Sequence, residues 1–430
     1  MWPDLKLPSM RMIDQEFEIP PSIDIFQEIE KEWECIENKV RLPQGSTVAV
    51  GVGSRGVANL TSVVKVIVEK LISKGYNPFI IPAMGSHGGA IAEGQIKVLR
   101  ARGITEESVG APIRASMEVK CIGEANGMPL FISRLAYEAD GIVLINRIKP
   151  HTNFVGSTES GLLKMLAIGM GNQIGAEHYH RLAVVRDYYT VISTAGRELL
   201  KRCSVLFGVA LVENQKHETA ILKIALPEQI EEVEANLLRY ARKWLPTLPI
   251  GEVDLLIIDE MGKDISGEGI DPNVVGRDVC ECGMRRTKPR ISRIFVRDLT
   301  EGSEGSGLGI GQADFTTERL VKKIDFNVTI VNCITCCCPE SGRVPLTFAN
   351  DKQAINAALK TVRPYQLDNI RLVYIKNTME LDKLLVSTGC LDYLRKNIRL
   401  KISEEEFELK FDSMGNLISP FRGSSHDGPR

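Results

Sequence analysis

The sequence predicts an α/β protein with two domains and largely parallel sheets. The first observation behind this is that short, continuous apolar runs alternate with amphipathic stretches along the 430 residues. The second is that the apolar runs carry no regular polar alternation, which is typical of strands covered on both faces. The third is an ordinary composition, 43% hydrophobic and 25% charged, which excludes wholesale disorder.

The apolar runs are the candidate strands, and the amphipathic stretches between them are the candidate helices. The predicted strands are Thr47–Val52, Pro78–Pro82, Gly141–Asn146, Val205–Val212, Asp254–Asp259, Ile291–Val296 and Val328–Asn332. The predicted helices are Asn59–Ser73, Gly94–Arg102, Leu182–Arg202, Glu228–Trp244, Thr316–Ile324, Asp351–Thr361 and Glu380–Ser387. This strand–helix order favours parallel pairing.

A domain boundary is predicted at Leu245–Gly251, where two prolines and a glycine follow a long helix. Proline restricts its own backbone and that of the residue before it, so the helix is not expected to continue. We therefore expect an N-terminal α/β domain over residues 1–246 and a C-terminal α/β domain over residues 247–430.

The charge balance and the apolar segments exclude several classes of partner. The 53 Lys+Arg against 55 Asp+Glu give a net charge of −2, which argues against a dedicated nucleic-acid binder. No apolar stretch approaches the roughly 20 residues that a membrane helix needs. The N-terminal residues have no basic segment followed by an apolar core, so we expect a cytoplasmic protein without a membrane partner.

Ten cysteines are expected to be thiols in such a compartment. Two segments could hold a soft metal or an iron–sulfur cluster if they meet in the fold. One carries Cys280 and Cys282, and the other carries Cys333, Cys336, Cys337 and Cys338. Their apolar neighbours favour buried thiols instead.

A glycine-rich turn, Gly51–Gly56, follows a predicted strand and precedes a predicted helix. It matches G-x-G-x-x-G formally, and Arg55 could add a phosphate contact. The next strand lacks the terminal acidic residue that holds a ribose. A plain strand-to-helix turn with a solvated arginine remains the alternative.

Two polar segments follow the next predicted strands. His87 lies in the glycine-rich loop Met84–Ala90, and His151 and Lys164 lie in the polar stretch Arg147–Lys164. In open α/β sheets, ligands bind beyond the carboxyl ends of strands. A helix over Ser160–Met170 with Ser160 as its N-cap would bring free N–H groups to the same place. The alternatives are a loop histidine that binds backbone and an exposed helix lysine.

His178 and His180 form an H-x-H pair that could bind nickel, copper or zinc. On a helix, residues i and i+2 point apart, so only one of them would face a site. In the C-terminal half, the glycine-broken loop Asp259–Arg277 carries Lys263, Asn273 and Arg277, which could hold a substrate carboxylate. A structural surface loop is an equal alternative there.

The chain resembles the nickel-pincer lactate racemase family in the order of four residues, His87, His151, Lys164 and His180. The resemblance implies two α/β domains with an interdomain active-site cleft. It implies a cofactor of nickel held by a pyridinium-3,5-bisthiocarboxylate mononucleotide, which separate cofactor-synthesis enzymes supply.

The resemblance also implies residue roles. His87 and His151 match the two acid–base residues, Lys164 matches the lysine that anchors the cofactor, and His180 matches the nickel ligand, with His178 as the fallback. Ser54 and Arg55 match the pair that holds the cofactor phosphate.

The implied activity is that of an isomerase, a racemase or epimerase of a 2-hydroxy acid acting by proton-coupled hydride transfer. Thirteen positions separate His151 from Lys164, about one helical turn more than in the family pattern, which indicates a divergent branch. The polar run Thr152–Ser160 favours a substrate more polar than lactate.

Two other classes remain open from the sequence. One is an NAD- or flavin-linked oxidoreductase that uses the Gly51–Gly56 turn. The other is a non-catalytic homologue that binds a small molecule or a metal.

Overall fold

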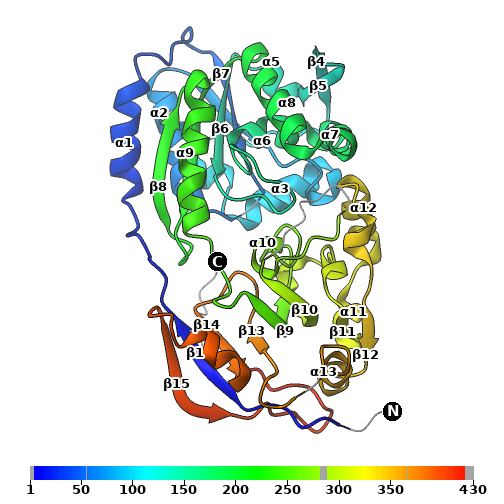
Figure 1. Cartoon of the computed structure of the whole chain (residues 1–430). Helices are drawn as coiled ribbons and strands as arrows, with labels where there is room; N and C mark the ends of the chain where they lie inside the picture. The colour runs from blue at the N-terminus through cyan, green and yellow to red at the C-terminus, as the bar shows by residue number, and fades with distance from the viewer. Residues whose placement is uncertain (1–3, 55, 281–287, 365, 422–430) are drawn as a thin grey trace. The chain divides into compact units, whose positions relative to one another are not determined.

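The computed structural model describes residues 4–54, 56–280, 288–364 and 366–421. Its internal contacts divide the chain into two compact units (Figure 1). The N-terminal unit comprises Glu18–Leu245 and the short segment Thr335–Cys337, and the C-terminal unit comprises the rest, including the residues up to Phe17. Each unit has an open sheet with helices, and most strand pairs are parallel, so the predicted α/β class is confirmed.

The N-terminal unit contains a five-stranded sheet in the order β3-β2-β6-β7-β8. Its strands are β2 (Thr47–Val52), β3 (Asn77–Pro82), β6 (Gly141–Arg147), β7 (Val205–Glu213) and β8 (Thr219–Ala225). The first four are mutually parallel, and β8 pairs with β7 antiparallel. A separate hairpin is formed by β4 (Val119–Ala125) and β5 (Met128–Ser133).

The helices of this unit cover both faces of the sheet. They are α1 (Ile25–Ile36), α2 (Leu60–Ser73), α3 (Ala92–Ala101), α4 (Glu106–Val109), α5 (Arg134–Glu138), α6 (Leu162–Lys164), α7 (Asn172–Arg186), α8 (Tyr188–Arg202) and α9 (Ile230–Lys243). The apolar faces of α1 and α2 share a core with Val48, Val50 and Val52 of β2. The other face packs against α6 and α9 (Figure 1). Strands buried on both faces explain why these runs are continuously apolar.

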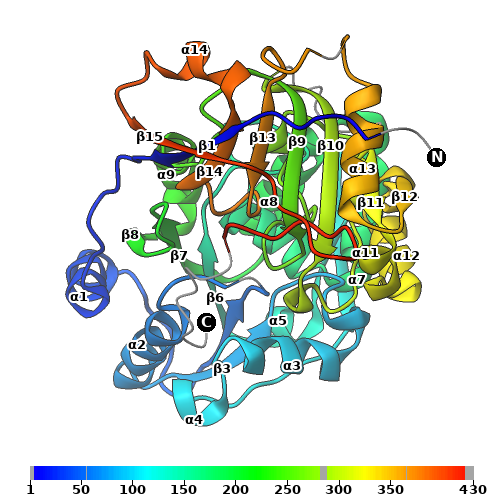
Figure 2. The same ribbon diagram turned by 90° about the horizontal axis from the view of Figure 1, so that it is seen from below.

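The C-terminal unit contains an eight-stranded sheet in the order β12-β11-β10-β9-β13-β14-β1-β15. The strands are β1 (Met10–Gln15), β9 (Glu252–Met261), β10 (Arg290–Leu299), β11 (Phe315–Thr317), β12 (Leu346–Phe348), β13 (Leu372–Ile375), β14 (Lys383–Ser387) and β15 (Leu400–Phe407). The first five strands in the sheet order are parallel, and the last three run antiparallel to their neighbours, with β1 and β15 side by side (Figure 2).

The helices of the C-terminal unit are α10 (Pro272–Val275), α11 (Glu318–Lys323), α12 (Phe326–Thr335), α13 (Asp351–Lys360) and α14 (Leu391–Leu394). Val274 of α10 and Leu320 of α11 belong to one core cluster, and Ala354 and Ile355 of α13 belong to the other. Two separate cores around one sheet are the arrangement expected of a doubly covered sheet.

Most predicted strands are confirmed, but two predicted elements are wrong. The predicted strand Val328–Asn332 lies within the helix α12, because a short apolar run does not distinguish a strand from a helix. The predicted helix Glu380–Ser387 contains instead the strand β14, whose residues Leu384–Val386 are buried in the antiparallel part of the sheet.

Two further predicted helices have different limits. The predicted helix Leu182–Arg202 is divided at Asp187, which has φ 68°, ends α7 and caps α8 by accepting the Thr190 N–H at 2.8 Å. The start of Thr316–Ile324 is extended as β11 before α11 begins.

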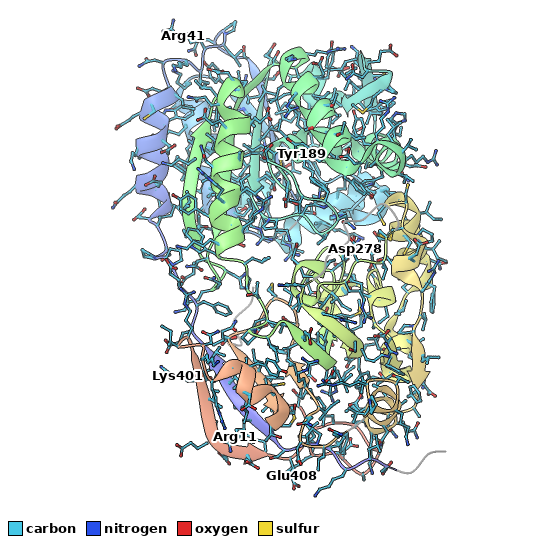
Figure 3. The ribbon with its side chains drawn as sticks, viewed as in Figure 1. Arg11, Arg41, Tyr189, Asp278, Lys401 and Glu408 are labelled. Atoms are coloured by element: carbon cyan, nitrogen blue, oxygen red, sulfur yellow. A yellow bond between two sulfur atoms is a disulfide. The ribbon has the colours of Figure 1, made fainter. Side chains whose placement is uncertain are left out.

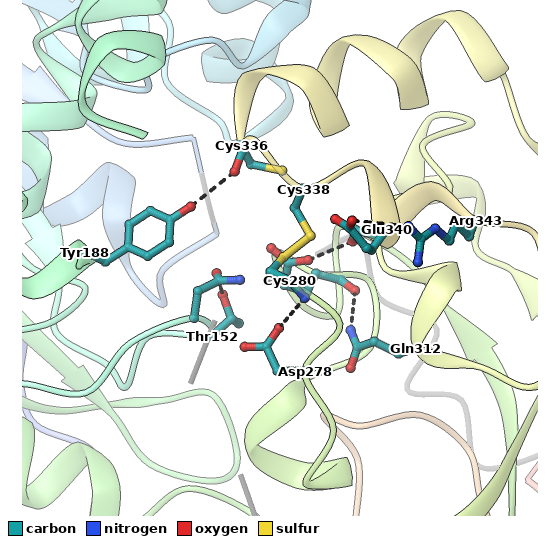
Figure 4. Close-up of a disulfide and its surroundings, with 12 residues drawn as sticks. Thr152, Tyr188, Asp278, Cys280, Gln312, Cys336, Cys338, Glu340 and Arg343 are labelled. Carbon is teal, nitrogen blue, oxygen red and sulfur yellow. Dashed lines mark hydrogen bonds and ion pairs between the residues drawn. A yellow bond between two sulfur atoms is a disulfide. The ribbon is translucent and has the colours of Figure 1, made fainter. Parts of the chain in front are cut away.

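The expectation of ten thiols is wrong at one pair, because Cys280 and Cys338 form a disulfide (Figure 4). The two cysteine-rich loops therefore meet. Among the described cysteines, Cys333 and Cys390 are buried thiols, as their apolar neighbours indicate. Cys282 lies outside the described residues. Within the described ranges, every helix is too short or too polar to cross a bilayer.

A buried ion-pair network ties the C-terminal segment to the larger sheet. Arg297 on β10 donates from Nη1 to the carboxylate of Asp259 and to the Tyr374 hydroxyl. Its Nε and Nη2 both donate to one carboxylate oxygen of Asp351, at 2.9 and 2.7 Å. Asp351, which is fully buried, also accepts the Leu417 N–H at 2.8 Å. Buried charges of this kind require their partners, because a lone ion in the interior is costly.

We predict that Asp351→Ala destabilises the protein by about 3–5 kcal/mol, since it leaves the Arg297 guanidinium buried and only partly paired. Unfolding by denaturant, followed by circular dichroism, measures this. Lys352→Ala is the matched control, because the Lys352–Asp4 pair is exposed and is expected to contribute less than about 1 kcal/mol. Equal effects of the two changes would contradict the role given to Asp351.

Candidate functional site

The candidate site is a cavity of about 130 Å³ in the N-terminal unit, at the carboxyl ends of β2, β3 and β6. It is lined by Gly53, Ser54, Val57, Ala83, Met84, His87, Asn146, Arg147, Lys149, Ser160, Lys164, Met165, Ile168 and Gly169. These residues come from the end of β6, from the segments that follow the three strands and from the helical segment 162–169. Of the residues predicted from the sequence, Ser54, His87 and Lys164 share this cavity.

The strand order explains why a cavity forms there. From β2 the chain moves to β3 on one side, and later to β6 on the other side of β2. The loops after β2 and β6 therefore leave the sheet in opposite directions and open a crevice. Such a topological switch point is where open α/β sheets bind their ligands.

His87 reaches the cavity from the glycine-rich loop after β3. Its Nδ1 lies 2.5 Å from the Ser54 Oγ, and its backbone N–H donates to the Met84 carbonyl at 3.2 Å. Gly88, at φ +67°, lets the loop pass α3 closely, because a Cβ there would lie 2.5 Å from the backbone of Gly94 and Gln95. This glycine therefore lets the loop pack directly against α3.

The cavity wall is rich in positive charge. Arg147, Lys149 and Lys164 all line it. Arg147 is paired with the carboxylate of Glu213, whose other oxygen accepts the Ala58 N–H at 2.7 Å. Glu213 neutralises the charge of Arg147, and the two lysines of the wall favour an anionic ligand such as a carboxylate or a phosphate.

The segment from Lys149 to Ser160 is a closed loop rather than an open polar run. Lys149 and Ser160 exchange both backbone hydrogen bonds, at 2.9 and 3.2 Å. Inside the loop, the buried carboxylate of Glu159 accepts the N–H groups of His151 at 2.6 Å and Gly156 at 3.1 Å. Arg242 of α9 pairs with the same carboxylate at 2.5 Å.

A contact with α8 also holds this loop. The hydroxyl of Tyr189, labelled in Figure 3, lies 2.6 Å from the Ser157 Oγ. The loop is thus held at its ends, at its centre and on its outer side. This keeps the backbone of His151 in a fixed place.

The helical segment that carries Lys164 begins differently from the prediction. Gly161, not Ser160, precedes α6, and the Leu162 and Leu163 N–H groups donate to the buried carboxyl of Glu234. The prediction that these N–H groups are open to a ligand is therefore wrong. A Cβ at position 161 would lie 1.7 Å from the Glu234 Oε1, which explains the glycine. Burial raises the pKa of Glu234 to about 8.

His151 lies outside the cavity lining, in a buried aromatic cluster. Its ring stacks on Phe154 with centroids 4.3 Å apart, and its Nδ1 accepts the Asn153 N–H at 3.0 Å. Tyr188 lies next in the cluster, with its ring centroid 6.4 Å from that of His151.

His180 also packs against Tyr188, with ring centroids 5.8 Å apart. Its Nδ1 lies 2.8 Å from the Thr335 carbonyl, and the Tyr188 hydroxyl donates to the Cys336 carbonyl at 3.1 Å (Figure 4). Burial is the main cause that lowers the pKa of His180 to about 4. The hydrogen bond to the Thr335 carbonyl raises this pKa, and the charge of Lys164 lowers it. His180 is therefore neutral at pH 7 and close enough to Lys164 to feel its charge.

His178 and His180 are both on α7, and their rings have different surroundings. The ring of His178 packs edge-on against Phe131 and Tyr179, and its Nε2 is buried without a hydrogen-bond partner. Burial lowers its pKa as well. The two rings point apart, as two positions separated by two residues on a helix must.

The glycine-rich turn does not form the helix-terminal phosphate cradle of a dinucleotide fold. Six residues separate Gly53 from the start of α2 at Leu60, and Asn59 at its N-cap has φ 60°. The Glu213 carboxylate already occupies the Ala58 N–H near that end. A phosphate there would meet a like charge, which disfavours the dinucleotide interpretation. Arg55 lies outside the described residues.

The three predicted carboxylate partners in the C-terminal unit have structural roles. Arg277 donates to Asp314 at 2.7 Å and to the carbonyls of Gln312, Ile291 and Ser292. Asn273 is bonded to Asp271, which caps α10. Lys263 Nζ donates to Asn332 at 2.6 Å. The guanidinium of Arg277 has its donors engaged within the fold, so we give it no substrate role.

Comparison with known proteins finds a likeness in structure alone. No protein family model matches the chain, and no curated protein matches it. The chain is similar to the solved structure of the lactate racemase apoprotein from Thermoanaerobacterium thermosaccharolyticum, at 12% identity and a TM-score of 0.45. The match covers 67% of this chain and 74% of that chain. At this TM-score the likeness carries no functional assignment.

Sequence reasoning missed two residues that support the site. Glu234 lies on the buried face of α9 with Ile230, Leu237 and Leu238, and an acidic residue on an apolar helix face was the available signal. Tyr188, whose ring contacts those of both His151 and His180, had no signal because only the fold brings those rings together. Within the described ranges, no cluster of three or more His, Cys, Asp or Glu side chains forms a ready metal site.

We predict that Glu234 makes stability depend on pH. Its folded pKa of about 8 lies above the ordinary value of 4.5, so the folded state holds the proton more tightly than the unfolded state. Its contribution is full below about pH 4.5 and is lost as the pH rises through 8, by a few kcal/mol at about 1.4 kcal/mol per pKa unit. Relative to Glu234→Gln, the unchanged protein should lose stability between these values.

Denaturant midpoints across this pH range, measured for both proteins, check the prediction. Glu231→Gln is the matched control, because Glu231 is half exposed on the same helix and pairs with Arg197, which lowers its pKa. A stability difference between Glu234→Gln and the unchanged protein that does not vary with pH would contradict the burial argument.

Proposed function

We propose that this protein racemises or epimerises a 2-hydroxy acid with a nickel-pincer pyridinium mononucleotide as its cofactor. The observation that carries the proposal is the sharing of one cationic cavity by His87, Lys149 and Lys164 at a topological switch point. The imidazole is suited to moving a hydroxyl proton near neutral pH. The cations are suited to holding a carboxylate and a phosphate.

The residues present fit the cofactor chemically. A metal-ligating histidine commonly donates its second ring N–H to a carbonyl, and the His180 Nδ1 lies at that distance from the Thr335 carbonyl. The low pKa of His180 keeps the Nε2 lone pair available for a metal at pH 7. One protein ligand suffices, because the pincer itself supplies the other donors.

Each of the chain's own residues then has a defined role. Lys164 would anchor the cofactor, His180 would bind the nickel, and Ser54 and Arg55 would hold the phosphate, as in the resemblance. When bound, the cofactor would supply a hydride acceptor. Lys149, fixed by its two backbone bonds to Ser160, would hold the substrate carboxylate against the cavity wall.

The substrate is a 2-hydroxy acid with further polar groups, such as a hydroxy diacid or a sugar acid. The support for this is the polar wall that Asn146, Arg147, Lys149 and Ser160 present to the cavity. A substrate with several polar groups would make more hydrogen bonds to such a wall than lactate could.

We predict that protein made in a host with the cofactor-synthesis enzymes binds nickel, carries a cofactor mass and racemises one or more 2-hydroxy acids. Metal analysis, intact mass and a chiral assay across a panel of hydroxy acids measure the three properties. His180→Ala should lose the nickel and Lys164→Ala should lose the added mass.

His178→Ala is the matched control, because His178 lies on the same helix and faces Phe131. Loss of nickel in this variant, with retention in His180→Ala, would reverse the ligand assignment. Tight NAD binding without nickel would favour the oxidoreductase alternative. Absence of metal, adduct and turnover would favour a non-catalytic homologue.

A further inference from the structure

The side-chain amide of Asn146 has its two ends at different places in the candidate site. Asn146 is on β6 and lines the cavity. Its Nδ2 donates to the carbonyl of Gly161, a residue outside the cavity lining, at 2.8 Å. Its Oδ1 lies toward Gly53, a residue of the lining, since a Cβ built on Gly53 would be 3.4 Å from that oxygen. The acceptor end of the amide is therefore the end on the cavity side.

The Gly161 carbonyl fixes this orientation of the amide. A carbonyl only accepts hydrogen bonds, so a turned amide would set two oxygens against each other and lose the bond. The carbonyl is itself held in place, because the adjacent Ser160 exchanges two backbone hydrogen bonds with Lys149. Asn146 therefore presents a fixed acceptor at Oδ1.

An amide oxygen discriminates between the polar groups of a ligand. It accepts up to two hydrogen bonds and donates none. A carboxylate oxygen has no proton to give at neutral pH and would meet the partial negative charge of Oδ1, whereas a hydroxyl donates its proton and gains a bond. Lys149 and Lys164 of the same wall favour an anion. Together, these features favour an anion that also carries a hydroxyl.

We propose that the cavity selects anions that carry a hydroxyl group, and that the Asn146 Oδ1 accepts the hydrogen bond of that hydroxyl. The proposal rests on the proposed function, which supplies two sources of such a group. One source is the 2-hydroxy acid, and the other is the ribose of the mononucleotide. In either case the ligand's O–H donates to Oδ1 while its anionic group lies near the lysines. Asn146 is then a specificity-determining residue, at which no covalent bond is made or broken.

Gly53 keeps the space beside this oxygen open. A methyl group there would lie 3.4 Å from the Asn146 Oδ1 and 3.4 Å from the Met165 Cε, which are ordinary contact distances. The backbone of Gly53 is also outside the left-handed region. Alanine would therefore fit without a clash, fill the space next to the acceptor and leave the bond to Gly161 in place. Gly53→Ala thus separates the proposed role of Oδ1 from the structural role of Nδ2.

Titration calorimetry on the full chain without cofactor tests the preference in two arms. In the first arm, each enantiomer of malate is compared with succinate, which lacks only the hydroxyl. In the second arm, ribose 5-phosphate is compared with tetrahydrofurfuryl phosphate, which keeps the ring and the phosphate but has no hydroxyl. We expect the hydroxylated member to bind about threefold to tenfold more tightly in at least one arm, as one hydrogen bond usually contributes. A preference in the first arm identifies the substrate as the source, and one in the second arm identifies the ribose.

Variants assign the preference to Asn146. Asn146→Ala and Gly53→Ala should both lower the ratio of the two affinities to about one. Gly56→Ala is the matched control in the same turn and should keep the ratio, because a Cβ at Gly56 would face the Arg102 guanidinium, with Nη1 at 3.4 Å. A purely structural role of Asn146 would weaken both members of a pair equally and leave the ratio unchanged.

Equal binding of the two members in both arms, or no binding of any probe, would overturn the proposal. So would a preference that survives both Asn146→Ala and Gly53→Ala. If circular dichroism shows that Asn146→Ala does not fold, Gly53→Ala alone decides. A preference that depends on Asn146, found together with loaded enzyme that turns over no hydroxy acid, would support this inference and contradict the proposed function.

Discussion

The hydrogen-bond register of three parallel strands is the constraint on which the candidate site depends. Val52 at the end of β2 pairs in register with Pro82 of β3 on one side and Ile145 of β6 on the other. The residues that follow these positions therefore leave the sheet at one level. Because the chain reverses its direction of winding at β2, the segments after β2 and β6 diverge and leave a cavity between them. The positions of Ser54, His87 and Lys149 follow from that register.

Buried carboxyl groups then fix the segments that leave the sheet. Glu159 gathers N–H groups inside the loop between Lys149 and Ser160, and Glu234 caps the helix that carries Lys164. Both groups bond backbone rather than a ligand. A carboxylate inside a cationic cavity would weaken the binding of an anionic substrate. A carboxyl group behind the cavity wall avoids this repulsion and holds the wall in place.

The fold class and most parallel strands could be predicted, because strands buried on both faces leave an unbroken apolar signal. The helix α12 could not, because its apolar residues Phe326, Ile330 and Ile334 are exposed and give no amphipathic pattern. The antiparallel strand β14 was missed because the charged residues just before it alternate with leucines in a pattern that is also typical of an amphipathic helix. Its actual state is decided by pairing with β1, far away in the sequence.

For the site, the sequence indicated residue types but not their grouping. His87 and Lys164 share the cavity, whereas His151 and His180 belong to an aromatic cluster around Tyr188. The Ser160 cap was wrong because the competing partner, Glu234, lies more than 70 positions further along the chain. No local pattern reports a contact of that range. The same holds for Arg277, whose partners Gln312 and Asp314 are brought to it by β11.

The chemical identity of a histidine is therefore set less by the ring than by what its second nitrogen meets. Three imidazoles of one small domain have the same intrinsic chemistry, yet their Nδ1 atoms meet a hydroxyl, an amide N–H and a carbonyl. None of these partners is a charged group, and two of them are backbone atoms that no substitution pattern could reveal. A backbone partner cannot be mutated away without moving the chain, so the Nδ1 contacts of His151 and His180 are built into the fold. The Nδ1 of His87 instead meets a side chain, Ser54, and a substitution there could alter this contact most easily.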